Sequence, residues 1–320
     1  MRDVDVVEQA AARIVELVME AMASPAWHQP VLVDAVLEHL APAPGRTIVD
    51  ATLGTAGHAL ALLPKLLPDG RLIGFDRDAQ ALELARPRLS EFAPQASSAQ
   101  ADFRELGAAL AALKIGRVDG VLLDLGVSSL QFDTAERGFS FAKDAPLDMR
   151  MDRRAEPTAE TLVNTLSAEE LTEILQTLGE ERFARRIARG IIEARRTARI
   201  TTTAQLSRIV IQAYPSGARH GRLHAATRTF QALRLAVNDE LGALSAVLEQ
   251  LPDILAPGGR AVIISFHSLE DRLVKHAFAQ GAREGLWRVL TKKPLQASDA
   301  EVDRNPRARS AKLRAVERLG

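Results

Sequence analysis

The chain has 320 residues, of which 47% are hydrophobic and 26% are charged, and its formal net charge is zero. These values are typical of a globular protein with one large domain or a large domain and a smaller companion, and they exclude attraction to RNA through net charge alone. The absence of cysteine excludes disulfides, thiolate metal sites and cysteine nucleophiles.

The amino-terminal region predicts two helices before the first strand. It lacks the features of a secretory signal, and no apolar run in the chain is long enough to span a bilayer, so we expect a cytoplasmic protein without a membrane partner. Residues 5–22 carry apolar side chains at helical spacing, and we interpret residues 1–25 as a helix appended to the main fold. Residues 31–40 predict a second helix, which ends before Pro42 and Pro44.

Strands and helices then alternate along the chain. The predicted strands cover residues 47–50, 71–76, a weaker segment before Asp102, and 118–125, and the intervening helices cover 58–67, 78–89 and 105–113. This alternation predicts an α/β domain whose sheet is mainly parallel and covered by helices on both faces.

The alternation stops after the fourth strand, and the next predicted elements are all helices, at 167–178, 181–199, 203–213 and 224–251. A strand returns at 260–266 after the turn Pro257–Gly259, and a helix at 268–280 and a short strand near 287–290 follow. We therefore predict one α/β domain, residues 26–140 plus 228–320, interrupted by a helical insertion at 141–227.

The turn after the first strand reads Asp-Ala-Thr-Leu-Gly-Thr-Ala-Gly-His over residues 50–58. Ligands of a doubly wound sheet bind beyond the carboxyl ends of its strands, and Gly54 and Gly57 would let the backbone approach a ligand there. The turn lacks the three spaced glycines of dinucleotide-binding enzymes. Taken alone, it also fits an ordinary tight turn.

Three further residues follow predicted strands. Asp76 ends the second strand, where a carboxylate can bind both hydroxyls of a ribose, although helix capping is an alternative. Phe103 follows the third strand and could form a wall of an adenine slot. Asp124 ends the fourth strand and could face a cofactor or a substrate amine, or could instead cap the turn through Ser128 or Ser129.

Positive charge is concentrated between Arg182 and Arg234, a region with twelve arginines and one acid, Glu193. The first four arginines recur at three- and four-residue intervals and share one helical face: Arg182, Arg185, Arg186 and Arg189. Such a face predicts contacts with RNA phosphates, and neutralisation by acids from elsewhere is the alternative. Residues 304–318 form a second, weaker basic segment.

The histidines allow more than one interpretation. His267 follows the predicted strand at 260–266, where it could contact a substrate phosphate or base, or could simply cap or pack. His220 and His224 flank Gly221 without acidic or thiol companions, so we predict no metal site there.

Longer motifs occur at His28–Leu32, Asp124–Ser129, Glu136–Phe141, Leu147–Asp152, Gly179–Ala184, Thr227–Arg234, Ser265–Asp271 and Asn305–Arg314. Through these motifs the chain resembles the 16S rRNA cytosine-N4 methyltransferases, the RsmH or MraW family, over residues 27–316. The resemblance implies a Rossmann-like class I methyltransferase fold, S-adenosyl-L-methionine as cofactor, and methylation of the N4 amino group of a decoding-centre cytidine, cytosine 1402. The implied partner is 16S rRNA within the small (30S) ribosomal subunit.

The resemblance also assigns cofactor contacts to Ala56, Gly57, His58, Asp76, Phe103, Asp124 and Gln131. Two positions depart from the family pattern. Ala56 stands where the family has glycine, and its methyl group disfavours a positive φ. Leu130 stands where the family has proline, which could loosen the turn that aims Gln131.

Methylation of an exocyclic amine suits these residues. Methylation of ring carbon 5 generally needs a cysteine thiolate, which the chain lacks, whereas the amine needs only a hydrogen-bond acceptor and in-line positioning. We predict that Asp124 and the following turn with Ser128 catalyse transfer, and that Phe139 or Phe141 stacks the base, with core packing as the alternative for both. The predicted substrate contacts are Phe139, Arg185, Arg189, Arg228 and His267.

Two other functions compete with this interpretation. A nicotinamide-dependent oxidoreductase also begins with a strand, a glycine turn and a helix, but the third glycine and an obvious hydride-transfer group are missing. A noncatalytic RNA-binding factor with a vestigial cofactor pocket is supported only by Ala56. The sequence leaves the oligomeric state open, a homodimer included.

Overall fold

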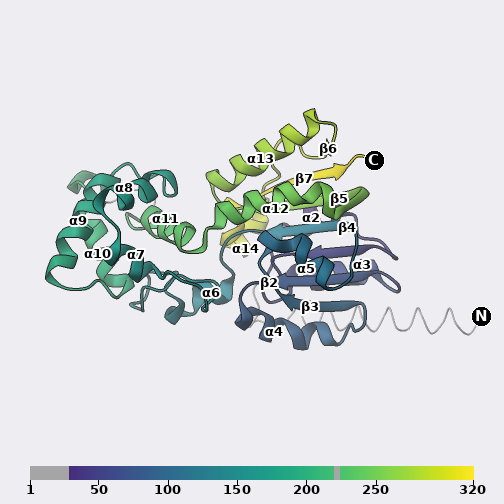
Figure 1. Cartoon of the computed structure of the whole chain (residues 1–320), viewed down its shortest axis with the longest axis horizontal. Coiled ribbons are helices and arrows are strands. Elements are labelled where there is room, and N and C mark those ends of the chain that lie inside the picture. Colours follow the sequence, from purple (N-terminus) through teal and green to yellow (C-terminus); the bar gives the residue numbers. More distant parts are fainter. Residues whose placement is uncertain (1–28, 220–223) are drawn as a thin grey trace, which may run out of the picture. The chain divides into compact units, whose positions relative to one another are not determined.

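The computed structural model describes residues 29–219 and 224–320, which form two compact units (Figure 1). The sheet unit lies within Met1–Gly126 and Leu241–Gly320, and the helical unit is Val127–Glu240. The helix predicted for residues 1–25 lies outside the described residues. Within the described ranges, no helix combines the length and apolar character that a membrane span requires.

The sheet unit contains a seven-stranded sheet in the order β3-β2-β1-β4-β5-β7-β6. Its strands are β1 (Thr47–Asp50), β2 (Arg71–Asp76), β3 (Ala96–Gln100), β4 (Val118–Asp124), β5 (Leu255–Ser265), β6 (Trp287–Val289) and β7 (Lys312–Arg318). The first five run parallel, and β7 pairs antiparallel with β5 and β6. The predicted α/β class with a parallel-dominated sheet is confirmed.

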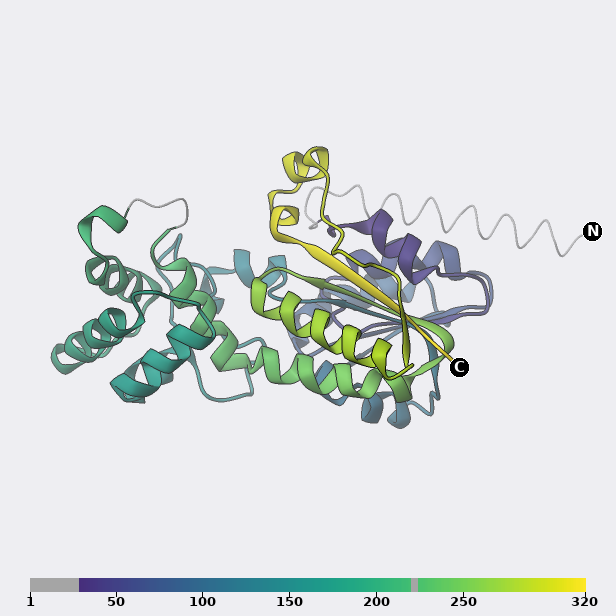
Figure 2. The ribbon, with the colours of Figure 1, turned by 90° about the horizontal axis from the view of Figure 1, so that it is seen from above.

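Alternating strand residues build two separate cores, one on each face of the sheet. Ile48 and Leu122 pack beneath α2 (Val33–Leu40), α3 (Gly57–Leu66) and α4 (Ala79–Ser90). Val49 and Val121 face the opposite core, formed with α5 (Leu106–Ala112), α12 (Glu240–Ile254) and α13 (Ser268–Arg283). Figure 2 shows the sheet between α2 on one side and α12 and α13 on the other. Both faces are thus covered, as the apolar central strands β1 and β4 require.

The helical unit has a core of its own. Its helices are α6 (Ser129–Asp133), α7 (Ala159–Thr165), α8 (Ala168–Thr177), α9 (Ala184–Thr197), α10 (Thr203–Ala213) and α11 (Thr227–Asn238). Leu171, Ile187 and Leu206 are fully buried within it. The chain therefore buries a second apolar cluster away from the sheet.

The boundaries of the helical unit differ from the predicted 141–227. The Asn238 side chain donates to Met149 O at 2.7 Å and accepts from Met151 N at 2.8 Å, which ties the end of α11 to the preceding loop. Residues 127–140 and 228–240 consequently pack with the helices. The prediction of a single helix at 224–251 is wrong, because Asp239 adopts a left-handed conformation (φ 43°) that separates α11 from α12.

The carboxyl-terminal segment is part of the sheet unit. Residues 304–318, predicted as a second basic segment, contain β7, which lies within the sheet. Arg314 is buried, and its Nε donates to Asp271 Oδ1 at 2.7 Å. The positive charge of this arginine is therefore neutralised inside the fold. The predicted turn Pro257–Gly259 lies inside β5, beside an irregularity in the pairing with β4.

Candidate active site

Three aspartates lie at the carboxyl edge of the sheet. Asp50, Asp76 and Asp124 are the last residues of β1, β2 and β4, and β1 pairs in parallel with both neighbours. All three carboxyl groups therefore belong to the same edge. The sequence analysis does not predict Asp50 as a site residue, although it ends its strand in the same way as the other two.

The glycine turn lies beside these carboxylates. Gly54 adopts φ 52°, a left-handed conformation, and its N–H donates to Asp76 Oδ2 at 2.8 Å. A Cβ atom on Gly57 would lie 3.3 Å from the Pro30 ring, so glycine allows this close approach. Ala56 is buried with φ 69°, the region that its methyl group disfavours by about 1–2 kcal/mol.

Asp76 remains able to bind a ligand. Its Oδ1 accepts from Asp78 N at 2.8 Å, and each carboxylate oxygen has room for a second hydrogen bond. Asp78 instead caps α4 by accepting from Gln80 N at 3.0 Å, so the capping alternative describes Asp78. Burial raises the pKa of Asp76 to about 6, against the two backbone hydrogen bonds that lower it.

Phe103 begins a short 3-10 helix, Phe103–Glu105, and is half-buried against the core beneath α5. Asp102 caps this turn by accepting from Arg104 N at 2.9 Å, and it pairs with Arg77 at 3.3 Å. Asp102 therefore has local structural partners, although it follows β3 much as Asp76 follows β2. The placement of Phe103 leaves part of its ring available to a ligand.

Asp124 and His58 face each other at this edge. His58, only 6% exposed, places Nε2 at 2.9 Å from Val31 O and Nδ1 at 3.6 Å from Asp124 Oδ2. Thr52 Oγ1 accepts from Asp124 N at 2.6 Å, which fixes the end of β4 to the turn. No described residue hydrogen-bonds to the buried Oδ1 of Asp124. An acceptor is thus held at the strand end without a protein donor.

Burial governs the charge of these groups. It raises the pKa of Asp124 to about 7, and the nearby negative charge of Glu270 acts in the same direction. It also raises the pKa of Asp50 to about 7, although the proximity of His58 opposes this. The pKa of His58 is lowered by burial, against the attraction of Asp50. A positively charged ligand bound beside these acids would lower their pKa values and favour their ionised forms.

His267 takes a capping position in the structure. It is the N-cap of α13, where its ring accepts from Glu270 N at 3.4 Å and Glu270 Oε2 accepts from Phe266 N at 2.8 Å. His267 Nε2 also lies 3.1 Å from Glu270 Oε1. The capping alternative therefore describes His267, and its contact with substrate stays a prediction.

Ser128 and Gln131 belong to the helical unit and form a capping box at the start of α6. Gln131 Oε1 accepts from Ser128 N at 3.0 Å, and Ser128 Oγ accepts from Gln131 N at 3.3 Å. This pair of bonds holds the turn with Leu130 in place of proline. The predicted roles of Ser128 in catalysis and Gln131 in cofactor binding stay predictions.

The aromatic candidates pack inside the helical unit. Phe139 is 7% exposed and belongs to its apolar core. Phe141 stacks on His224 with ring centroids 4.6 Å apart and meets Phe230 edge-on. The packing alternative therefore describes both phenylalanines as they lie here.

Three arginines of the predicted face, Arg185, Arg186 and Arg189, lie on α9, whereas Arg182 lies in the turn before this helix. Arg182, Arg185, Arg186 and Arg189 are all exposed. Across residues 29–219 and 224–320, no acidic side chain forms an ion pair with Arg185, Arg186 or Arg189. Arg228 is also exposed, and its Nη1 donates to Glu180 O at 2.9 Å. The face is therefore not neutralised by described acids, which leaves it available to anions.

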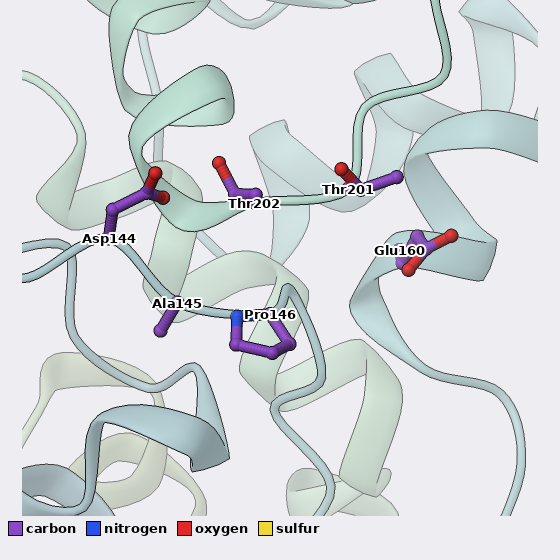
Figure 3. A pocket seen from close by; sticks show the side chains of 6 residues that line it. All are labelled: Asp144, Ala145, Pro146, Glu160, Thr201 and Thr202. Atoms are coloured by element: carbon purple, nitrogen blue, oxygen red, sulfur yellow. The ribbon is translucent and has the colours of Figure 1, made fainter.

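A separate, open pocket in the helical unit is lined by Asp144, Ala145, Pro146, Glu160, Thr201 and Thr202 (Figure 3). Asp144 accepts from Ala204 N at 3.2 Å, and Glu160 pairs with Arg199 at 2.6 Å. None of the predicted site residues lines this pocket, and both of its acids already have partners. Among the described residues, no group of three or more acids or histidines is arranged to hold a metal ion.

The chain as a whole is similar to known methyltransferases. The family model described as the MraW methylase family matches residues 25–319. Ribosomal RNA small subunit methyltransferase H of Geobacter sulfurreducens is 54% identical over 307 residues, covering 91% of this chain and 99% of the relative. The protein of the same name from Nitratidesulfovibrio vulgaris is 51% identical over 318 residues, covering 94% and 98%. An rRNA methylase structure from Streptococcus thermophilus aligns with 92% of this chain and all of its own, at 13% identity and a TM-score of 0.40.

Proposed function

The chain belongs to the MraW methylase family, and from this premise we propose that it transfers the methyl group of S-adenosyl-L-methionine to the N4 amino group of a cytidine in small-subunit rRNA. The proposed target is the decoding-centre cytosine 1402 within the 30S subunit. The observation that carries the proposal is the buried Oδ1 of Asp124, which lies at the edge of the sheet and accepts no hydrogen bond from the described residues.

Groups of the sheet unit would contact each part of this cofactor. Asp76 can accept the two ribose hydroxyls, the turn with Gly54 and Gly57 offers backbone beside the methionine portion, and the Phe103 ring can cover the adenine. The cofactor supplies a methyl group on a positively charged sulfonium. Nearby carboxylates such as Asp50 and Asp124 are stabilised in their ionised form by such a charge, which offsets their burial.

Asp124 would orient the substrate amine. The lone pair of the N4 nitrogen is delocalised into the ring, and accepting an N–H of the amine concentrates electron density on the nitrogen and aims it. Asp124 Oδ1 can accept such a hydrogen bond, because it has no described partner. The backbone N–H of Asp124 donates to Thr52 Oγ1, and the other carboxylate oxygen faces His58 Nδ1 at 3.6 Å. This chemistry requires no covalent enzyme intermediate.

The exposed arginines on α9 would bind the rRNA backbone. Arg185, Arg186 and Arg189 lack described acidic partners, so a phosphate need not displace an existing ion pair. Guanidinium groups bind phosphates in a bidentate manner, and such contacts make affinity depend on salt. The helical unit would thereby hold the substrate without reading its sequence.

The decisive experiment incubates purified small subunits with labelled cofactor, digests the rRNA and identifies the labelled nucleoside. We expect N4-methylcytidine from the wild type, at least about 100-fold less from Asp124→Asn, and near-normal product from Asp119→Asn. Asp119 is a matched control, since it lies on the same strand but accepts from Thr47 N at 2.8 Å at the far end. A label on carbon 5, or full activity of Asp124→Asn, would contradict the proposal. Binding of NAD without binding of S-adenosylhomocysteine would favour the oxidoreductase instead.

A further inference from the structure

The surroundings of the His58 ring determine its tautomer. Nε2 lies 2.9 Å from the carbonyl oxygen of Val31, which can only accept a hydrogen bond. A neutral His58 must therefore carry its proton on Nε2. Nδ1 is then left with a lone pair, and it points to Asp124 Oδ2 at 3.6 Å.

Two acceptors facing each other at this distance repel unless a proton lies between them. Either a protonated Asp124 donates to Nδ1, or a protonated Nδ1 donates to the Asp124 carboxylate. The separation is only a few tenths of an ångström beyond a direct hydrogen bond, so a small movement of the carboxyl group closes it.

The segments that hold Val31 come from both ends of the described chain. Leu32 N donates to Glu301 Oε1 at 2.7 Å, and Asn305 Nδ2 donates to Gln29 O at 2.9 Å. Val31, between these anchored residues, is itself buried. Glu301 and Asn305 thus keep the carbonyl that sets the His58 tautomer in place.

We propose that His58 and Asp124 share one proton. In this arrangement His58 is a positioning residue that takes the proton of the Asp124 carboxyl group, so that Asp124 can accept the proton of the methylated amine. The inference rests on the proposed function, because it takes Asp124 as the acceptor of the amine. No cofactor contact of the His58 side chain is required.

The proton transfer balances in either starting form. When Asp124 is protonated, the amine N–H bond breaks as an O–H bond forms at Oδ1, while the Oδ2–H bond breaks and an N–H bond forms at His58 Nδ1. When Asp124 starts ionised and His58 protonated, Oδ1 takes the amine proton directly. Both routes end with protonated His58 beside neutral Asp124, and the proton later leaves to solvent.

The charged groups around the pair decide which form dominates. Asp50 faces His58 from β1, Asp76 lies at the end of β2, and Glu270 approaches Asp124 from α13. Burial lowers the pKa of His58 and raises the pKa of Asp124 to about 7. Below that pH, Asp124 is largely protonated, and it can accept the amine proton only if a neutral His58 takes the proton that its carboxyl group already carries.

The test compares His58→Gln with the wild type in single-turnover methyl transfer as a function of pH. The Gln amide can still donate to Val31 O near the Nε2 position, but it has no Nδ1 and cannot take a proton. We expect the ratio of wild-type to variant rate to rise about tenfold between pH 8 and pH 6, because one tenth of Asp124 stays ionised one unit below a pKa of about 7. Affinity for S-adenosylhomocysteine, measured at the same pH values, should differ from the wild type by a factor that does not change with pH. A defect that is independent of pH, or a wild-type profile, would overturn the inference.

Nitrogen NMR of the His58 ring provides a readout that does not need activity or a stable His58 variant. We expect the Nε2–H tautomer at pH 8 and a displaced His58 titration in Asp124→Asn. An Nδ1–H tautomer, or a His58 titration that ignores Asp124→Asn, would refute the shared proton. If the titration responds but Asp124→Asn retains full methyl transfer, the proposed function fails instead.

Discussion

Replacing Asp76 by alanine tests the cofactor site most directly. Asp76 is the carboxylate predicted to accept both ribose hydroxyls, and a hydrogen bond to a charged acceptor contributes about 1.5–3 kcal/mol. Since the wild-type carboxylate also accepts from Gly54 N and Asp78 N, the variant loosens the turn as well. We expect a loss of about 3 kcal/mol in binding, which corresponds to a Kd roughly 100-fold higher.

Calorimetric titration with S-adenosylhomocysteine measures this change without methyl transfer. Asp102→Ala is the matched control, since Asp102 also follows a strand but caps a 3-10 turn and pairs with Arg77. The control should lower thermal stability modestly and keep the Kd within about threefold. If Asp76→Ala binds as tightly as the wild type, or if both variants lose affinity equally, Asp76 does not bind the ribose.

Three other changes probe the arginine face, the strained turn and the buried charge. Arg185→Glu combined with Arg189→Glu should weaken binding to small ribosomal subunits at least tenfold at low salt and make the binding affinity less dependent on salt, while cofactor affinity stays constant. If the salt dependence of binding is unchanged, these arginines do not contact the RNA backbone. Ala56→Gly should change the free energy of unfolding by less than about 0.5 kcal/mol, because relief of the strained φ of 69° offsets the loss of the buried methyl group. The control Ala59→Gly, inside α3, should lower the free energy of unfolding by about 2 kcal/mol. Denaturant titrations that give equal losses for the two variants would refute this reasoning. Burial raises the pKa of Asp124 from 3.8 to about 7, so the ligand-free protein should lose stability relative to Asp124→Asn as the pH rises between these two values. We expect a loss of about 2 kcal/mol between pH 5 and 7, and parallel stability profiles of the two proteins would disprove the raised pKa.

The strands that carry the site followed from local pattern. β1 and β2 have the predicted bounds, because each is a short apolar run between turn residues, and Asp76 and Asp124 end their strands as expected. The predicted family is confirmed over nearly the whole chain. By contrast, the sequence does not predict β7 as a strand, since its arginines conceal the alternation of Leu313 and Ala315.

The sequence by itself determined the α/β class, the family and the edge at which the acids gather, because these depend on spacing along one stretch of chain. Only the tertiary structure decided which groups meet there. His58 lies between Val31 O, 27 residues earlier, and Asp124, 66 residues later, and no local pattern predicts such neighbours. The same holds for the burial of Phe139 and the neutralisation of Arg314 by Asp271. Hydrogen-bond partners and desolvation in a core are set by segments distant in sequence, so the ionisation of a site is a property of the packed fold.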